Sequence, residues 1–129
     1  MKKIKLSDTQ PKSKRINIVH PIHGELDAWI ELISVTSEEP FIKMVELSKQ
    51  YTPGEEVKDL KKNLTETSEV LSMCIVNWDE DFFECDASND NKVKILSKVE
   101  NSWLRNFVKH EVERTENFFI MWHCVTNLL

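Results

Sequence analysis

The chain has 129 residues, which suits one domain, and 40% of them are apolar while 30% are charged. This composition excludes an intrinsically disordered chain, and a count of only two glycines argues against a many-turned β-sandwich. The net charge of −5 is unevenly placed, because residues 1–15 carry six basic groups and one acid, a balance of +5 that leaves −10 on the remainder. An acidic body excludes extensive contact with the phosphate backbone of nucleic acid.

The N-terminal residues differ in pattern from the rest of the chain. Residues 1–14 show no apolar periodicity and end in a Pro/Ser/Lys stretch, which predicts a flexible basic arm. Residues 15–129 are expected to form a single globular domain. No apolar run is long enough for a signal peptide or a membrane span, and three sparse cysteines suit a reducing compartment. We therefore expect a cytoplasmic protein without a membrane partner.

Residues 15–35 have the pattern of a β-hairpin. Apolar residues alternate with polar ones on both sides of a Pro-Ile-His-Gly turn, in which Gly24 can adopt a positive φ. This alternation places Ala28, Ile30 and Leu32 on one face. An isolated hairpin is only marginally stable, so this face is expected to pack on the rest of the chain.

Apolar residues at helical spacing follow the hairpin. They predict four helices, at about residues 37–50, 54–78, 92–115 and 118–128. The stretch 79–91 is interpreted as a polar loop that Phe82 and Phe83 anchor to the core. The fold class expected is therefore α+β, mainly α, with an N-terminal β-hairpin followed by a bundle of about four helices.

One polar segment resembles a calcium-binding loop in part. Asp86, Ser88 and Asp90 occupy the first, third and fifth positions of such a loop. However, Asn91 stands at the sixth position, where the loop needs glycine, and Ser97 stands at the twelfth, where it needs a bidentate glutamate. We therefore interpret the segment as a turn favoured by its Asn and Asp residues.

Other candidates for chemistry lack a supporting pattern. His20 and His23, like the adjacent His123 and Cys124, do not have the paired spacing of a closed tetrahedral zinc site. Cys74 lies in the most apolar part of its expected helix, where burial raises the pKa of a thiol and makes it unreactive. We therefore expect no catalytic residue, no cofactor and no metal ligand, and predict that the protein is not an enzyme.

The apolar segment near the end of the chain is the remaining candidate feature. Its side chains include Phe118, Phe119, Met121 and Trp122, which are the candidate partner-binding residues. Large exposed apolar patches usually mark contact sites. A buried core helix would explain the same pattern equally well, so both interpretations stay open here.

The order of these elements resembles the tail assembly chaperones of long-tailed bacteriophages. The resemblance rests on the segments His20 to Glu25, Ala28 to Leu32, Val76 to Asp79 and Asn91 to Leu96. It covers about residues 16–115 and is a pattern of spacings. In that family a short strand pair with a Pro/Gly turn precedes a helical body.

The resemblance implies an assembly factor of the host bacterial cytoplasm. Such a factor binds the tape measure protein, helps to recruit tail tube protein, self-associates to a homo-oligomer, and needs neither a cofactor nor catalysis. The apolar segment after Asn117 matches no pattern of that family. The alternative is a small acidic phage-encoded binder that inhibits or regulates a host protein.

Overall fold

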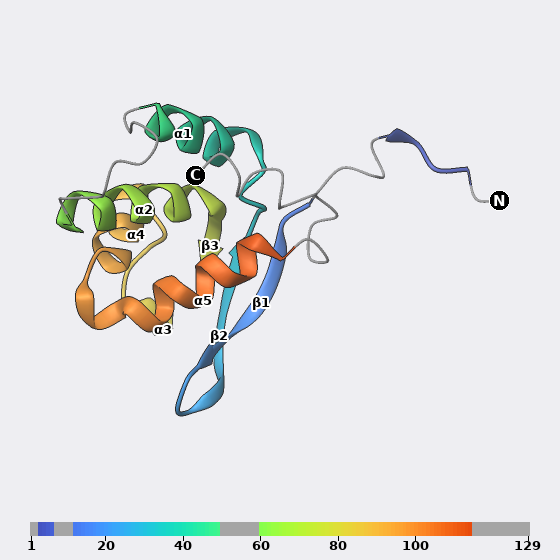
Figure 1. Ribbon diagram of the computed structural model, residues 1–129. Coiled ribbons are helices and arrows are strands. Elements are labelled where there is room, and N and C mark those ends of the chain that lie inside the picture. Colours follow the sequence, from blue (N-terminus) through green and yellow to red (C-terminus); the bar gives the residue numbers. More distant parts are fainter. Residues whose placement is uncertain (1–2, 7–11, 50–59, 115–129) are drawn as a thin grey trace.

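The structure is a computed structural model that describes residues 3–6, 12–49 and 60–114. Figure 1 shows a three-stranded antiparallel sheet, in the order β1-β2-β3, beside the helices of the body. Five α-helices lie within the described ranges. The expected α+β, mainly α architecture with an N-terminal hairpin is therefore confirmed.

The hairpin consists of β1 (Lys14–His20) and β2 (Gly24–Leu32). Its register places Ile16 opposite Ile30, so apolar side chains of both strands share one face. Gly24 has a φ of 72°, the left-handed conformation that the turn requires and that glycine adopts without strain. The tip of the hairpin projects beyond the helices (Figure 1).

Helix α1 (Glu38–Ser48) follows the hairpin closely, at the position expected from the sequence. Ser37 is its N-cap residue, and the backbone carbonyl of Ser37 accepts a hydrogen bond from the amide of Phe41. The Ser37 side chain makes no capping hydrogen bond. Pro40 and Met44 are buried and fix the inner face of the helix.

The chain passes directly from helix α2 (Leu60–Cys74) into strand β3 (Ile75–Trp78). The prediction of one helix over 54–78 is therefore wrong for its last four residues. Trp78 lies opposite Ile30 of β2, and pairing with that strand overrides the helical periodicity of the local sequence. The β-branched isoleucine and valine that open β3 also favour the extended conformation.

The rest of the described chain is more segmented than the sequence indicates. Its elements are α3 (Glu80–Phe83), α4 (Asn89–Leu96), the 3₁₀ helix η2 (Val99–Asn101) and α5 (Ser102–Glu113). The interpretation of 79–91 as a loop is thus wrong for α3 and for the start of α4. The single helix expected over 92–115 is two helices joined by a 3₁₀ turn.

Side chains stabilise the break between α4 and α5. The Arg105 guanidinium donates to the carbonyls of Leu96 at 2.6 Å and Lys98 at 3.3 Å, and the Asn101 amide donates to the carbonyl of Ile95 at 2.8 Å. These bonds satisfy carbonyl groups that a continuous helix would have paired internally. The break is therefore encoded by polar residues downstream of it.

The short helix α3 is anchored by aromatic contacts. The Phe83 ring stacks on the buried Trp78 ring with 3.9 Å between their centroids, and the Trp78 indole N–H donates to the carbonyl of Cys85 at 3.0 Å. Phe82 meets the edge of Phe83 and stays 39% exposed. The expected anchoring role is confirmed for Phe83, whereas Phe82 lies at the surface.

The core lies between one face of the sheet and the helices that gather on that side (Figure 1). Helix α2 is central, since it packs against α1, α4 and α5. The buried apolar residues are Ile18, Ala28, Ile30, Leu32, Val35, Met44, Val70, Leu71, Cys74, Ile75, Trp78, Leu96, Leu104, Val108 and Val112. The predicted inner face of the hairpin is therefore confirmed.

Two sequence-based predictions lie outside the described residues. These are the helix over 118–128 and residues 54–59 of the second expected helix. Among the helices that the structure describes, none combines the length and the apolar character needed to cross a membrane.

Candidate functional site

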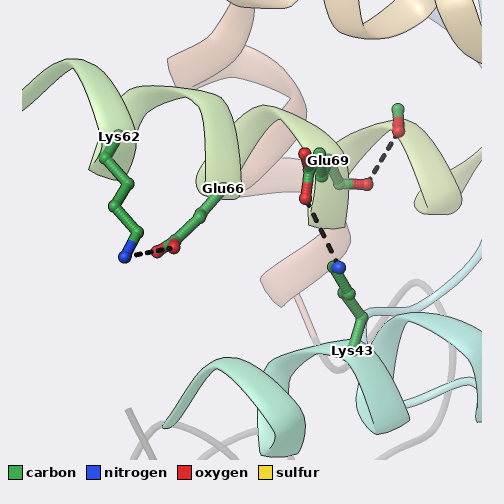
Figure 2. Close-up of polar contacts among 5 residues, drawn as sticks. Lys43, Lys62, Glu66 and Glu69 are labelled. Atoms are coloured by element: carbon green, nitrogen blue, oxygen red, sulfur yellow. Dashed lines mark hydrogen bonds and ion pairs between the residues drawn. The ribbon is translucent and has the colours of Figure 1, made fainter. Parts of the chain in front are cut away.

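The partner-binding residues predicted from the sequence, Phe118, Phe119, Met121 and Trp122, lie outside the described residues. Their assignment therefore stays a prediction. A different candidate surface lies within the described part of the chain, where helices α1 and α2 run side by side (Figure 2).

An open groove of about 510 Å³ separates these two helices. Its walls combine the aliphatic parts of long side chains with charged groups of both signs. The lining residues are Lys43 and Leu47 from α1, and Lys61, Lys62, Thr65, Glu66 and Glu69 from α2. Three lysines and two glutamates leave this surface close to neutral.

Helical periodicity explains why α2 supplies most of the groove. Lys62, Glu66 and Glu69 recur at intervals of four and three residues, so they share one face of the helix. Leu71 and Cys74 lie on the opposite face and are buried in the core. The sequence correctly places the charged residues away from the core, but the groove itself arises because α1 packs beside them.

Two ion pairs order the charged groups of the groove. The Lys43 ammonium lies 3.4 Å from a Glu69 carboxylate oxygen across the groove, and the Lys62 ammonium lies 3.9 Å from Glu66 along α2 (Figure 2). The Ser72 hydroxyl also donates to the backbone carbonyl of Glu69. Because the Lys43 and Glu69 side chains are 29% and 36% exposed, their pair contributes only about 0.2–1 kcal/mol.

This weak pairing matters for binding. The Lys43 and Glu69 side chains can exchange each other for opposite charges on another molecule. Leu47 supplies an apolar contact between them. A leucine flanked by both signs of charge complements an amphipathic helix, which carries apolar and charged residues on its surface.

A second feature, which unlike the groove is buried, lies on the other side of α2. Lys92 of α4 is only 6% exposed, and its ammonium donates to the backbone carbonyl of Ile75 at 2.9 Å. Burial lowers the pKa of Lys92, while the nearby Cys74 and Glu39 oppose that shift. Burial likewise raises the pKa of the Cys74 thiol far above its ordinary value, with Lys92 opposing. The expected unreactive environment of Cys74 is therefore confirmed.

The sequence contained a signal for the buried lysine that was not used. Lys92 stands four residues before Leu96, and both are buried on the same face of α4. A lysine that falls on the apolar stripe of a short helix is a candidate for burial. Its single described hydrogen bond to a strand carbonyl joins α4 to β3 and indicates a structural role.

The partial calcium-loop pattern has a local structural role. Asp86 accepts hydrogen bonds from the backbone amide of Ser88 at 3.2 Å and from the Asn91 side chain at 2.9 Å. These bonds hold the pKa of the Asp86 carboxyl below its ordinary value, and those from Ser88 are the larger cause. The Ser88 hydroxyl in turn accepts from the amide of Asn91 and caps α4. These contacts confirm the interpretation as a turn.

The two histidines of the hairpin also have local partners. The Nδ1 atom of His20 accepts hydrogen bonds from the backbone amides of Ile22 and His23. The His20 ring lies 4.6 Å from the Trp103 ring of α5, measured between centroids. His20 therefore shapes the hairpin turn and joins it to the helical body.

Comparison of the chain with protein-family models, with curated proteins and with solved structures gave no match in any of the three. The resemblance to phage tail assembly chaperones therefore stays a prediction. The candidate site rests on the geometry of the groove alone.

Proposed function

We propose that this protein is a tail assembly chaperone of a long-tailed bacteriophage, which binds the tape measure protein and helps to recruit tail tube protein without catalysis. The observation that carries the proposal is the open groove between α1 and α2, in which Leu47 lies among charges of both signs. A long helical client offers a complementary surface along its length.

The architecture supports the same proposal. The expectation from the resemblance is a strand pair with a Pro/Gly turn followed by a helical body, and the described residues contain both parts. The net charge of −5 helps a complex with an aggregation-prone client to stay in solution. The apolar residues Phe118, Phe119, Met121 and Trp122 are proposed to extend the contact with the client.

Co-expression with the tape measure protein from the same genome tests this function. We expect the soluble yield of the client to rise in the presence of this protein, and the two chains to co-purify. Lys62→Glu should reduce both effects because it places a carboxylate beside Glu66 in the groove. Lys98→Glu is the matched control, since it makes the same change of charge at an exposed position on another part of the surface.

The outcome that would contradict the proposal is equal client solubility with and without this protein, together with no co-purification. That result would favour the alternative, a regulator of a host protein. The variant Trp122→Glu tests the contribution of the predicted partner-binding residues, which lie outside the described part of the chain. A loss of co-purification with Trp122→Glu but not with Lys62→Glu would indicate that the client binds outside the groove.

A further inference from the structure

The turn of the hairpin is closed by a histidine side chain. Pro21, Ile22 and His23 lie between the two strands, and His20 pairs with Gly24 at the end of the ladder. Pro21 has no backbone N–H. The amides of Ile22 and His23 both donate to the Nδ1 atom of His20, at 3.0 and 3.2 Å. One imidazole nitrogen therefore binds every backbone N–H group of the three turn residues.

This arrangement requires an imidazole without a proton on Nδ1. A neutral imidazole has one acceptor nitrogen and one donor nitrogen, so an accepting Nδ1 places the hydrogen on Nε2. The imidazolium form donates from both nitrogens. Its Nδ1–H would meet the N–H groups of Ile22 and His23, and both hydrogen bonds would be lost. A proton on Nδ1 of His20 and the closed turn therefore exclude each other.

Helix α5 holds the His20 ring independently of these hydrogen bonds. The ring centroid lies 4.6 Å from that of Trp103, which belongs to the first turn of α5. This contact does not involve a hydrogen bond to Nδ1, and an indole ring attracts a cation within about 6 Å of its centre. Protonation of His20 therefore releases the turn residues while the end of β1 stays against α5.

The charged groups around the His20 ring do not replace the two hydrogen bonds. The His23 ring lies 4.7 Å away between centroids, and two charged rings at this distance repel each other, which also favours release of the turn. Glu25 of β2 is bound by Asn17, and Arg105 of α5 is bonded to backbone carbonyls. Further charged groups of η2 and α5 are Glu100, Lys109, His110, Glu111 and Glu113. In the described part of the chain, none of these groups forms an ion pair with His20.

We infer that His20 is a pH-sensitive latch of the hairpin, which is closed when its imidazole is neutral and opens when Nδ1 takes up a proton. The charge of histidine changes between about pH 5 and 8, so the latch responds to mild acidification. Opening frees Ile22, whose side chain is already 85% exposed, together with His23. This inference does not depend on the proposed function.

NMR spectroscopy of the full chain from about pH 8 to pH 5, the range in which histidine titrates, tests the latch. At the upper end, the ring nitrogen signals of His20 should show a hydrogen on Nε2 and none on Nδ1. On acidification, the amide signals of Ile22 and His23 should shift in step with protonation of the His20 ring. Their protection from solvent exchange, corrected for the intrinsic effect of pH, should fall about tenfold because two hydrogen bonds are lost.

Three variants isolate the role of the accepting nitrogen. His20→Asn places an oxygen where it can accept from the same turn amides but does not titrate, so both amides should stay protected at every pH. His20→Phe keeps a ring beside Trp103 without an acceptor, and the amides should be weakly protected throughout. His23→Asn is the matched control, because it removes the neighbouring histidine and keeps the latch, so the Ile22 amide should still show the wild-type transition.

Three results would overturn the inference. The first is a hydrogen on Nδ1 of His20 at neutral pH. The second is full protection of the Ile22 and His23 amides while the His20 ring is charged. The third is a transition of unchanged size at these amides in His20→Asn, which would show that another group controls the turn.

Discussion

At the scale of single residues, Lys92 combines a charge with almost complete burial. Its ammonium has a hydrogen bond to the Ile75 carbonyl, yet burial still lowers its pKa. The folded protein therefore holds this proton less tightly than the unfolded chain does. The free energy of unfolding therefore depends on pH in the range where this lysine titrates.

We predict that Lys92→Met changes how stability varies with pH. Where both the folded and the unfolded wild type bind the proton, the cost of burying the charge is present in full. As pH rises through the lowered folded-state pKa toward the ordinary value of 10.5, the folded wild type loses the proton first and gains stability relative to the variant. Urea melts of both proteins across this range should show that the free energy of unfolding of the wild type rises relative to that of the variant as pH increases. A difference that does not vary with pH would show that the ammonium is well solvated.

A second residue-scale prediction concerns the core. Leu71 is 3% exposed in the last turn of α2, so Leu71→Ala should lower the free energy of unfolding by about 2–5 kcal/mol through a cavity. Val99 is 76% exposed on η2, and Val99→Ala should change the free energy of unfolding by less than about 0.5 kcal/mol. Denaturant melts measure both values. Similar effects for the two variants would mean that the burial assigned to Leu71 is incorrect.

At the scale of elements, the sequence predicted best where the local pattern and the tertiary environment agree. The hairpin has alternating apolar residues and a turn glycine, and it forms as expected. The segment 75–78 continues a helical stripe in the sequence, but pairing with β2 makes it a strand. The break before Ser102 was also missed, because the groups that satisfy its carbonyls, including Arg105, come later in the chain.

The hairpin turn provides a prediction at this scale. Gly24 has a φ of 72°, and a Cβ built there would meet no atom within 4 Å. Gly24→Ala should therefore cost about 1–2 kcal/mol through backbone conformation alone, without a steric clash. Gly24→Asn should cost less, since asparagine adopts the left-handed region more readily. Thermal melts of the two variants would contradict this account if asparagine were as damaging as alanine.

At the scale of the whole molecule, the candidate groove could not be predicted from the sequence. Helical spacing places Lys62, Glu66 and Glu69 on one face of α2, away from the buried Leu71 and Cys74. Only the packing of α1 beside α2 brings Lys43 and Leu47 to the same surface. The candidate residues that the sequence did propose, Phe118 to Trp122, lie outside the described part of the chain.

The most direct test of the proposed function is the affinity of the full chain for a labelled helical fragment of the tape measure protein, measured by fluorescence anisotropy. Leu47→Ala removes the apolar contact of the groove and should raise the dissociation constant about tenfold, as loss of a central contact does. Ile42→Ala is the matched control, because Ile42 is a 48% exposed aliphatic residue of the same helix that does not line the groove. We predict wild-type affinity for the control. Equal affinities for Leu47→Ala and the wild type, or no binding of the fragment by any of the three proteins, would contradict the account.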